Sequence, residues 1–424
     1  MAFVPECHAH SLLSPFSHSM TASTAMTALE RRSTQSLAFI FALRMLGLFL
    51  VLPVFALEAR KYPGGDDPAL VGLAMGIYGL TQGVLQIPFG IASDRFGRKP
   101  VIVVGLLLFA LGAFISAGAS TLHGLVLGRA LQGAGAISAA VTALLADQTR
   151  DEVRTKAMAL IGASIGLMFA LSLVLAPVLT AWLGLSGLFV LIALLALSGV
   201  AVVLWRVPTA PPLPVDAPRG SLREVLALGS LLRLDFGVFV LHAVQLAMWV
   251  AVPSMLVQAG LEKSLHWQVY LPAVLASFVV MGGTLFPLER RGHLRPVFLA
   301  AIVLIGLVQL GLWAVVDHQP GLLTLGGLLF IFFCGFNVLE ASQPSLASRL
   351  APARLRGTAL GVYNTLQSLG LFAGGALGGL LARSVGLHGL FLVSTLASAV
   401  WLLVAWPMST PGRVAAPSNA IISP

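Results

Sequence analysis

Four ionisable side chains lie inside long apolar stretches of the sequence: Arg44, Arg129, His242 and Glu340. A charge at the centre of a membrane-spanning helix costs about 2.5–3.5 kcal/mol on insertion scales, which makes each residue a functional candidate. Burial opposes ionisation of a carboxyl and a nearby cation favours it, so such a group can exchange a proton. Glu340, with Arg44 or His242 at a similar depth, is therefore a candidate proton carrier. The alternative is a fixed ion pair between Glu340 and Arg44 or a terminal arginine.

The other two buried charges also have two open interpretations each. His242 is either a pH-sensitive group, because an imidazole titrates near neutral pH, or a neutral core residue held by a hydrogen bond. Arg129 is either a structural or proton-linked group or a clamp for a substrate. Polar and aromatic side chains on the same stretches could contact a small molecule or could bond neighbouring helices: Tyr363, Asn364, Gln367, Gln245, Asn337 and Trp249.

The composition indicates an integral membrane protein. Hydrophobic residues make up 58% of the chain and charged residues only 10%, with a mean hydropathy of +0.94, whereas soluble domains carry about 25% charged residues. The apolar runs are long and continuous, which predicts helices rather than barrel strands. No Walker loop, metal-ligand spacing or catalytic grouping is present, so we expect neither an enzyme nor a metal site.

Twelve apolar segments are predicted to cross the membrane, with a longer connection between the sixth and the seventh. This predicts a disordered N-terminal tail over 1–33, a six-helix half over 34–206, a cytoplasmic linker over 207–233, a second half over 234–406 and a C-terminal tail over 407–424. The predicted spans are 35–57, 69–92, 99–118, 122–146, 156–183, 186–206, 234–257, 267–288, 295–316, 321–346, 357–381 and 387–406.

The distribution of cations predicts the orientation. If the N-terminus is cytoplasmic, nineteen of the 25 Lys and Arg residues lie on the cytoplasmic side, four lie outside and two lie within spans. Cationic loops stay in the cytoplasm, so both termini are expected there. The same rule accounts for the net charge of +9 without a nucleic-acid partner.

A charged, glycine-containing turn separates the second and third segments. It places an aspartate and three cations between two stretches with almost no charge, as is typical of a short cytoplasmic loop. Its spacing is G-x-x-x-D-R-x-G-R-K, formed by Gly90, Asp94, Arg95, Gly97, Arg98 and Lys99.

This spacing resembles motif A, the signature loop of the major facilitator superfamily between its second and third helices. The stretch Arg129-x-x-Gln132-Gly133-x-Gly135 is similar to motif B of the same family. Both resemblances lie within residues 34–406, over which the chain looks like a major facilitator transporter.

Two further resemblances refine the family. Gly162, Gly166 and Pro177 resemble motif C of the drug:proton antiporters, although Ala176 stands where that motif has glycine. We expect these glycines, and Gly370, Gly374, Gly375, Gly378 and Gly379 in the eleventh span, to allow close helix packing, with hinge motion as the alternative. Residues 43–47, 336–341 and 361–367 look like the YajR-type branch of proton-coupled efflux transporters, here expected without the C-terminal soluble domain that some of its members carry.

The resemblance implies an all-α polytopic membrane protein with twelve transmembrane helices in two six-helix halves. Helices 1, 4, 7 and 10 of this family line a central cavity, and the four buried charges lie one on each. The implied function is a secondary active transporter that exports small organic compounds in exchange for protons by alternating access. Proton-coupled uptake, or a non-transporting membrane sensor on the same fold, stays open as an alternative.

A gate at the cytoplasmic side is a further hypothesis. The second helix ends and the eleventh begins on that side, and the positive end of a helix dipole favours a carboxylate. Asp94 is therefore expected to cap helix 11 near Gly357, while Arg98 holds Asp94 and Asp147; the resemblance implies the same latch. The alternative is a plain positively charged turn with no gating role.

The expected partners follow from these predictions. They are a small-molecule substrate, protons and the lipid bilayer, with no nucleic acid, no bound cofactor and the proton gradient as the energy source. We expect a monomer in the plasma (inner) membrane.

Overall fold

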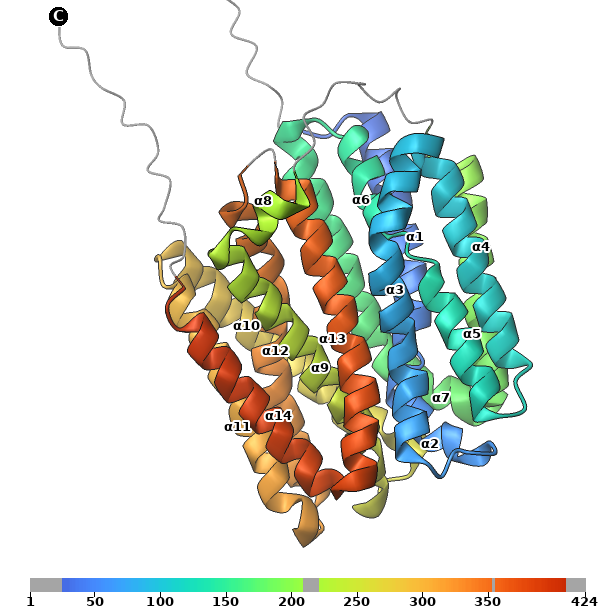
Figure 1. The fold of residues 1–424 in the computed structure, drawn as a ribbon, viewed down its shortest axis with the longest axis vertical. Coiled ribbons are helices and arrows are strands. Elements are labelled where there is room, and N and C mark those ends of the chain that lie inside the picture. The colour runs from blue at the N-terminus through green and yellow to red at the C-terminus, as the bar shows by residue number, and fades with distance from the viewer. Residues whose placement is uncertain (1–24, 209–220, 353–354, 409–424) are drawn as a thin grey trace, which may run out of the picture.

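The computed structural model describes residues 25–208, 221–352 and 355–408, which contain helices and no β-strand. Figure 1 shows a bundle of long helices that run roughly parallel to one another. The main helices are α1 (Ala28–Phe49), α3 (Pro68–Phe96), α4 (Arg98–Ala117), α5 (Leu122–Ala134), α6 (Ser138–Asp147), α7 (Asp151–Trp205), α9 (Gly229–Gln258), α10 (Trp267–Arg290), α11 (Leu294–Val315), α12 (Leu322–Leu350), α13 (Arg356–Ser384) and α14 (Gly386–Ala405). Short helices are α2 (Leu52–Glu58), α8 (Leu222–Leu226), η1 (Ala59–Lys61), η2 (Lys263–Leu265) and η3 (Val316–His318).

Eleven helical stretches of the described residues are long and apolar enough to cross a membrane, and α7 contributes two crossings. The 55 residues of α7 would extend about 80 Å as one straight helix, far more than a bilayer core of about 30 Å. Gly184 breaks the helix, with φ 67° and ψ −179°, a conformation that glycine adopts without strain. The fifth and sixth predicted spans are thus the two arms of α7, and the predicted twelve-helix fold is confirmed.

The helices form two groups that meet along α3 and α13. In Figure 1 the helices from α1 to α7 lie on one side and those from α9 to α14 on the other, with α3 and α13 side by side at the boundary. We call the end of the bundle at Asp94 and Asp147 the motif face, and the opposite end, at Glu58 and Asp67, the far face.

Glycines bring the backbones of α3 and α13 into direct contact. A Cβ atom on Gly375 would lie 2.6 Å from the carbonyl oxygen of Gly72 and 2.7 Å from the Cα of Gly76. We call this contact the glycine seam; its residues are Gly72, Gly76, Gly79, Gly375 and Gly379. The seam leaves no room for side chains, which confirms that glycines of α13 serve close helix packing.

The glycines of the motif C-like stretch behave differently, and the packing role predicted for them is wrong. No atom lies within 4 Å of a Cβ placed on Gly162, and only Phe278 Cζ, at 3.9 Å, lies near Gly166. Pro177 lies within the first arm of α7. These glycines therefore lie on an open part of the helix surface rather than in a helix–helix contact.

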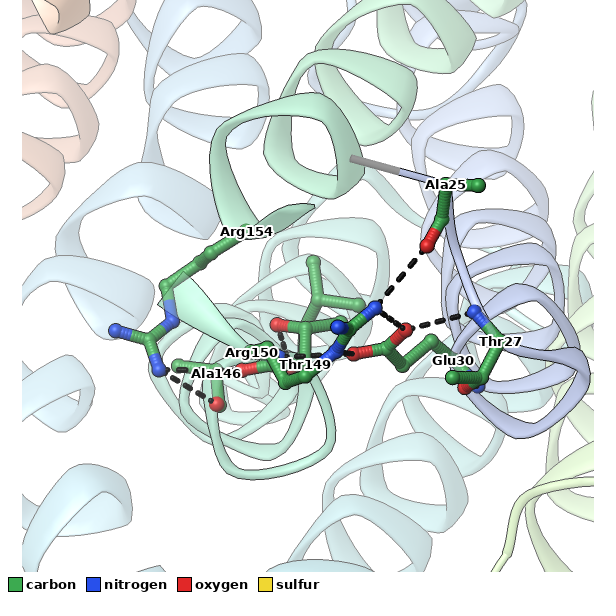
Figure 2. A network of polar contacts seen from close by, with 8 residues as sticks. Ala25, Thr27, Glu30, Ala146, Thr149, Arg150 and Arg154 are labelled. Carbon is green, nitrogen blue, oxygen red and sulfur yellow. Dashed lines mark hydrogen bonds and ion pairs between the residues drawn. The ribbon is translucent and has the colours of Figure 1, made fainter. Parts of the chain in front are cut away.

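The first helix begins earlier than predicted, because residues of the expected tail cap it. Thr27 and Glu30 form a reciprocal capping box: Glu30 N donates to Thr27 Oγ1, and Thr27 N donates to Glu30 Oε2. Arg150, which precedes α7, donates from Nε to Glu30 Oε1 at 2.8 Å and from Nη2 to Glu30 Oε2 at 3.1 Å (Figure 2). The helix therefore starts at Ala28; the rest of the predicted tail, over 1–24, lies outside the described residues.

Three other boundaries differ from the prediction. The predicted span over 122–146 is two helices, because Gly135 leaves the helical region with φ −74° and ψ 53°. The predicted linker is partly helical, since it contains α8 and the start of α9 at Gly229; residues 209–220 lie outside the described part. The motif A turn is shorter than predicted, because α3 continues to Phe96 and only Gly97, with φ 95°, separates it from α4.

Candidate functional site

A carboxyl, an imidazole and an amide from three helices meet in the second half. His242 Nε2 of α9 lies 3.4 Å from Glu340 Oε2 of α12. The side-chain amide of Gln367, from α13, lies 2.8 Å from His242 Nε2 and 3.3 Å from Glu340 Oε1. The structure thus brings together two predicted proton-coupling residues and one predicted substrate contact.

One ring nitrogen of His242 is held by the backbone, and the other faces Gln367 and Glu340. His242 Nδ1 lies 2.9 Å from the carbonyl oxygen of Val238, which only accepts, so Nδ1 carries a hydrogen and Nε2 is the variable position. A neutral His242 accepts at Nε2 from the Gln367 amide, and a charged His242 donates from Nε2 to Glu340. The Glu340 side chain is 34% exposed, and its Oε2 accepts no hydrogen bond.

Arg44 is held by neutral groups in the first half. Its Nη2 donates to Tyr78 Oη at 2.8 Å and to Gln82 Oε1 at 3.0 Å, and its Nη1 donates to Ser138 Oγ at 3.1 Å. Gln82 in turn donates from Nε2 to Ser368 Oγ of α13 at 3.0 Å. Hydrogen bonds therefore connect the buried Arg44 to the other half of the protein.

Arg129 lies over the ring of the same tyrosine. Its guanidinium carbon is 4.9 Å from the centre of the Tyr78 ring, and its Nη1 donates to Gln132 Oε1 at 3.1 Å. Neither arginine forms an ion pair with a carboxylate among the described residues, so the alternative of a fixed ion pair between Arg44 and Glu340 is not formed. The two groups belong to different halves, and Glu340 is contacted by His242 and Gln367 instead.

Arg98 organises the motif A residues at the motif face. It forms ion pairs with Asp94, one turn earlier, and with Asp147 at the end of α6, where Nε donates to Oδ2 at 3.0 Å. Lys99 Nζ donates to the carbonyl oxygen of Val207 at 2.9 Å. The guanidinium of Arg95 lies over the ring of Phe96, 5.6 Å from its centre. Both ion pairs expected for Arg98 are present.

The predicted contact between Asp94 and the start of α13 is not formed. Asp94 pairs with Arg98 and makes no hydrogen bond or ion pair with α13 in the described part of the chain. Around Gly357 and Gly361 of α13, no atom lies within 4 Å of a placed Cβ, and Gly90 of α3 approaches only Ala139 of its own half. The helices are therefore in contact along the glycine seam and apart at the motif face.

The far face is closed by contacts between the halves. Lys263 Nζ donates to Glu58 Oε1 at 2.9 Å, and Arg383 Nη1 donates to Asp67 Oδ2 at 3.0 Å. Both pairs join the first half to the second. Together with the glycine seam, they hold the two halves against each other at this end.

The remaining predicted substrate contacts are dispersed. Tyr363 donates from Oη to Gln343 Oε1 at 3.4 Å, and Asn337 donates from Nδ2 to Ser277 Oγ at 2.7 Å, so both connect helices. Trp249 packs edge-on against Tyr270 and, with Gln245, lines a small apolar pocket inside the second half. The half-buried Asn364 side chain has no hydrogen-bond partner among the described residues, and it is free to meet a ligand.

Residues 37–375 and 289–421 match the family profile of the Major Facilitator Superfamily. The chain belongs to this family. It is 45% identical over 393 residues to the inner membrane transport protein YajR of Escherichia coli (strain K12), covering 92% of this chain and 86% of YajR. It is 29% identical over 355 residues to the multidrug resistance protein MdtH of Yersinia enterocolitica, covering 79% of this chain and 82% of MdtH.

Solved structures of this superfamily share the fold. The human organic anion transporter MFSD10 superposes with a TM-score of 0.65 at 18% identity, covering 89% of this chain and 100% of that chain. A bacterial homologue of the human lysosomal transporter Spinster, inward-facing and occupied, superposes with a TM-score of 0.70 at 13% identity, covering 90% and 97%. The protein is thus a multi-pass membrane transporter of the superfamily and not an enzyme.

Two features of this major facilitator transporter escaped the sequence predictions. The ion pairs at the far face join residues more than 200 positions apart, so no local pattern indicates them. Asp235 is buried near the start of α9, although that position was assigned to the edge of a span. Its position two turns before His242, on the same helix face, is the signal that could have identified it.

Proposed function

We propose that this transporter exports small organic compounds in exchange for protons, by alternating access. The observation that carries the proposal is the cluster of Glu340, His242 and Gln367, in which a partly exposed carboxyl lies beside an imidazole and an amide. The names of two relatives, an inner membrane transport protein and a multidrug resistance protein, support transport of this kind.

The cluster supplies a simple means of exchange. A proton that binds Glu340 removes the negative charge that favours a bound cation or polar substrate, and substrate binding in turn favours loss of the proton. Gln367 and Asn364 lie one turn apart on α13, so a compound that bonds both also displaces the amide of Gln367 from His242. Binding of the proton and binding of the substrate therefore compete at the same place.

The two faces supply the gates. With the far face closed and the helices apart at the motif face, the described arrangement is open toward the motif face, which we assign to the cytoplasm on the basis of its cations. In the opposite state the start of α13 would approach Asp94, whose carboxylate suits a helix N-terminus, and the far-face ion pairs would separate. Arg98 and Asp147 would keep Asp94 in position for that contact.

The energy source in this proposal is the proton gradient, without a bound cofactor or a nucleic-acid partner, in a monomer. Transport in liposomes tests it: purified protein is reconstituted with a pH-sensitive dye inside, a proton gradient is imposed, and organic compounds are added one at a time. We expect a compound to drive proton movement opposite to its own, and Glu340→Gln to abolish that movement. The exposed Asp317 on η3 gives a control, since Asp317→Asn is expected to behave as wild type.

Other outcomes would contradict the proposal. Movement of compound and protons in the same direction would establish proton-coupled uptake instead. No coupled movement for any compound, in protein that retains its fold, would favour the membrane sensor.

A further inference from the structure

A second pocket lies between α8, α9 and α13, away from the Glu340 cluster and toward the motif face. On α13, Gly370, Gly374 and Gly378 contact the α9 backbone at Phe239, Ala243 and Ala247. Beyond this contact, toward the motif face, a pocket of about 380 Å³ lies between the helices. Its walls are apolar apart from one carboxylate, and they include Leu226, Phe236, Phe239, Val362 and Leu366.

The carboxylate in this pocket belongs to Asp235, and its charge has no partner. Asp235 is 4% exposed, and its Oδ2 is buried without a hydrogen bond. No cationic side chain forms an ion pair with it among the described residues. An isolated carboxylate in apolar surroundings is unfavourable by several kcal/mol unless it is neutralised or paired. A positively charged occupant of the pocket would supply the pairing for the ionised form.

The shape and walls of the pocket narrow the class of occupant. Its volume falls in the range of about 300–1,000 Å³ that is usual for sites of small organic ligands. Two phenylalanine rings line it, and aromatic faces attract organic cations. A metal ion is not favoured, because hard cations take about six or more oxygen ligands and the pocket offers one carboxylate. An anion would be repelled, and a neutral compound would leave Asp235 unpaired.

We propose that the pocket between α8, α9 and α13 binds a lipophilic organic cation, whose charge pairs with Asp235 and whose apolar body contacts Phe236 and Phe239. This inference deepens the proposed function, because it names a substrate class and a binding position on the cytoplasmic side of the Glu340 cluster.

Equilibrium binding to the purified full-length protein, without a membrane gradient, tests the inference separately from transport. The probe is radiolabelled tetraphenylphosphonium, and triphenylphosphine oxide serves as an uncharged competitor. We expect Asp235→Asn to weaken binding of the cation at least tenfold, since it keeps the shape of the side chain and removes its charge. Asp317→Asn, which removes an exposed carboxylate elsewhere, is expected to bind as wild type.

A second variant keeps the test valid if Asp235→Asn does not fold, as judged by its thermal melt. Leu366→Trp fills the pocket without changing its charge and is expected to abolish binding of the cation. Wild-type binding in both variants, or no binding of the cation to the wild type, would overturn the inference. So would loss of binding in Glu340→Gln alone, because the cation would then occupy the central cluster. Coupled transport with unchanged binding in Asp235→Asn would refute this inference and leave the proposed function intact.

Discussion

Buried charges in the two halves are held in different ways. Arg44 and Arg129 are contacted by neutral groups and share Tyr78, Arg44 at its hydroxyl and Arg129 over its ring, and a guanidinium stays charged throughout the physiological pH range. Glu340, in contrast, lies 3.4 Å from the imidazole of His242. At the residue scale, therefore, the first half supplies fixed positive charge, and in the proposed mechanism the second half supplies the exchangeable proton.

The fixed charge gives a prediction for Arg44. Its two terminal nitrogens bond Tyr78, Gln82 and Ser138 in different directions, and a lysine ammonium cannot reproduce that fork. We expect Arg44→Lys to lower the free energy of unfolding by about 1.5–3 kcal/mol, the usual contribution of a hydrogen bond to a charged group. The expected readout is a lower melting temperature in detergent. The same substitution at the exposed Arg60 is the control, and an unchanged melt for Arg44→Lys would contradict this account.

The sequence identified candidate site residues where the residue type alone was unusual for its surroundings. A charge within an apolar stretch stands out, so Glu340 and His242 could be selected without a structure. Their partners could not be selected in the same way, because Gln367 and Tyr78 are ordinary polar residues until helix packing places them beside a charge. The sequence left Arg44 and His242 open as neighbours of Glu340 for that reason, because depth in a helix does not show which groups a side chain faces.

At the element scale, α3 and α13 serve as the contact between the two halves. The glycine seam brings their backbones within contact distance over several turns, while the same helices are apart toward the motif face. Such a contact between smooth surfaces permits one helix to tilt on the other, which is the motion that alternating access requires. Glycines in α13 could be recognised from the sequence as packing residues, but their partner α3 could not.

The seam is tested by adding a single methyl group. Gly375→Ala would place a Cβ 2.6 Å from the carbonyl oxygen of Gly72, so the helices must separate. We expect at least a tenfold loss of transport in the liposome assay and a lower melting temperature. Gly361→Ala adds the same group on the same helix where no atom lies within 4 Å, and it is expected to transport as wild type. Equal activity of the two variants would contradict the role of the seam.

Helix breaks were the least predictable elements. Hydropathy identifies the spans because each must bury about twenty apolar residues in lipid, and it predicted the twelve-helix fold. Hydropathy does not detect a helix break at one residue, such as the break at Gly135 within the fourth predicted span. Hydropathy also does not detect helix capping. The helix α1, whose capping-box residue Glu30 contacts Arg150, therefore begins within a segment predicted to be a tail.

At the scale of the whole molecule, the two faces differ in whether ion pairs join the halves. The far face has ion pairs between the halves, Glu58 with Lys263 and Asp67 with Arg383, whereas the Arg98 pairs at the motif face lie within the first half. Closure of the far face is thus stabilised by existing ion pairs between the halves, whereas closure of the motif face requires a new contact between them. This asymmetry favours the arrangement that is open toward the motif face.

Charge reversal at the far face tests this asymmetry. Lys263→Glu places a carboxylate beside Glu58 and weakens closure of the far face. Because partly exposed ion pairs contribute about 0.2–1 kcal/mol, we expect transport to change only two- to fivefold. The double variant Glu58→Lys with Lys263→Glu restores opposite charges and is expected to recover part of the wild-type rate. Arg60→Glu, an exposed neighbour, serves as the control, and a double variant no better than Lys263→Glu would exclude a role for this pair.

The central claim is that protonation of Glu340 drives the change between the two open states. It is tested most directly by the distance across the motif face, measured by double electron–electron resonance with spin labels at Phe96→Cys and Gly357→Cys, after Cys7 and Cys334 are replaced by serine. Labels at Arg60→Cys and Glu262→Cys report the far face in parallel. We predict that lowering the pH shifts the two distance distributions in opposite directions, and that Glu340→Gln holds both at their low-pH values at every pH. Distances that respond to pH equally with and without the Glu340 carboxyl would contradict the account.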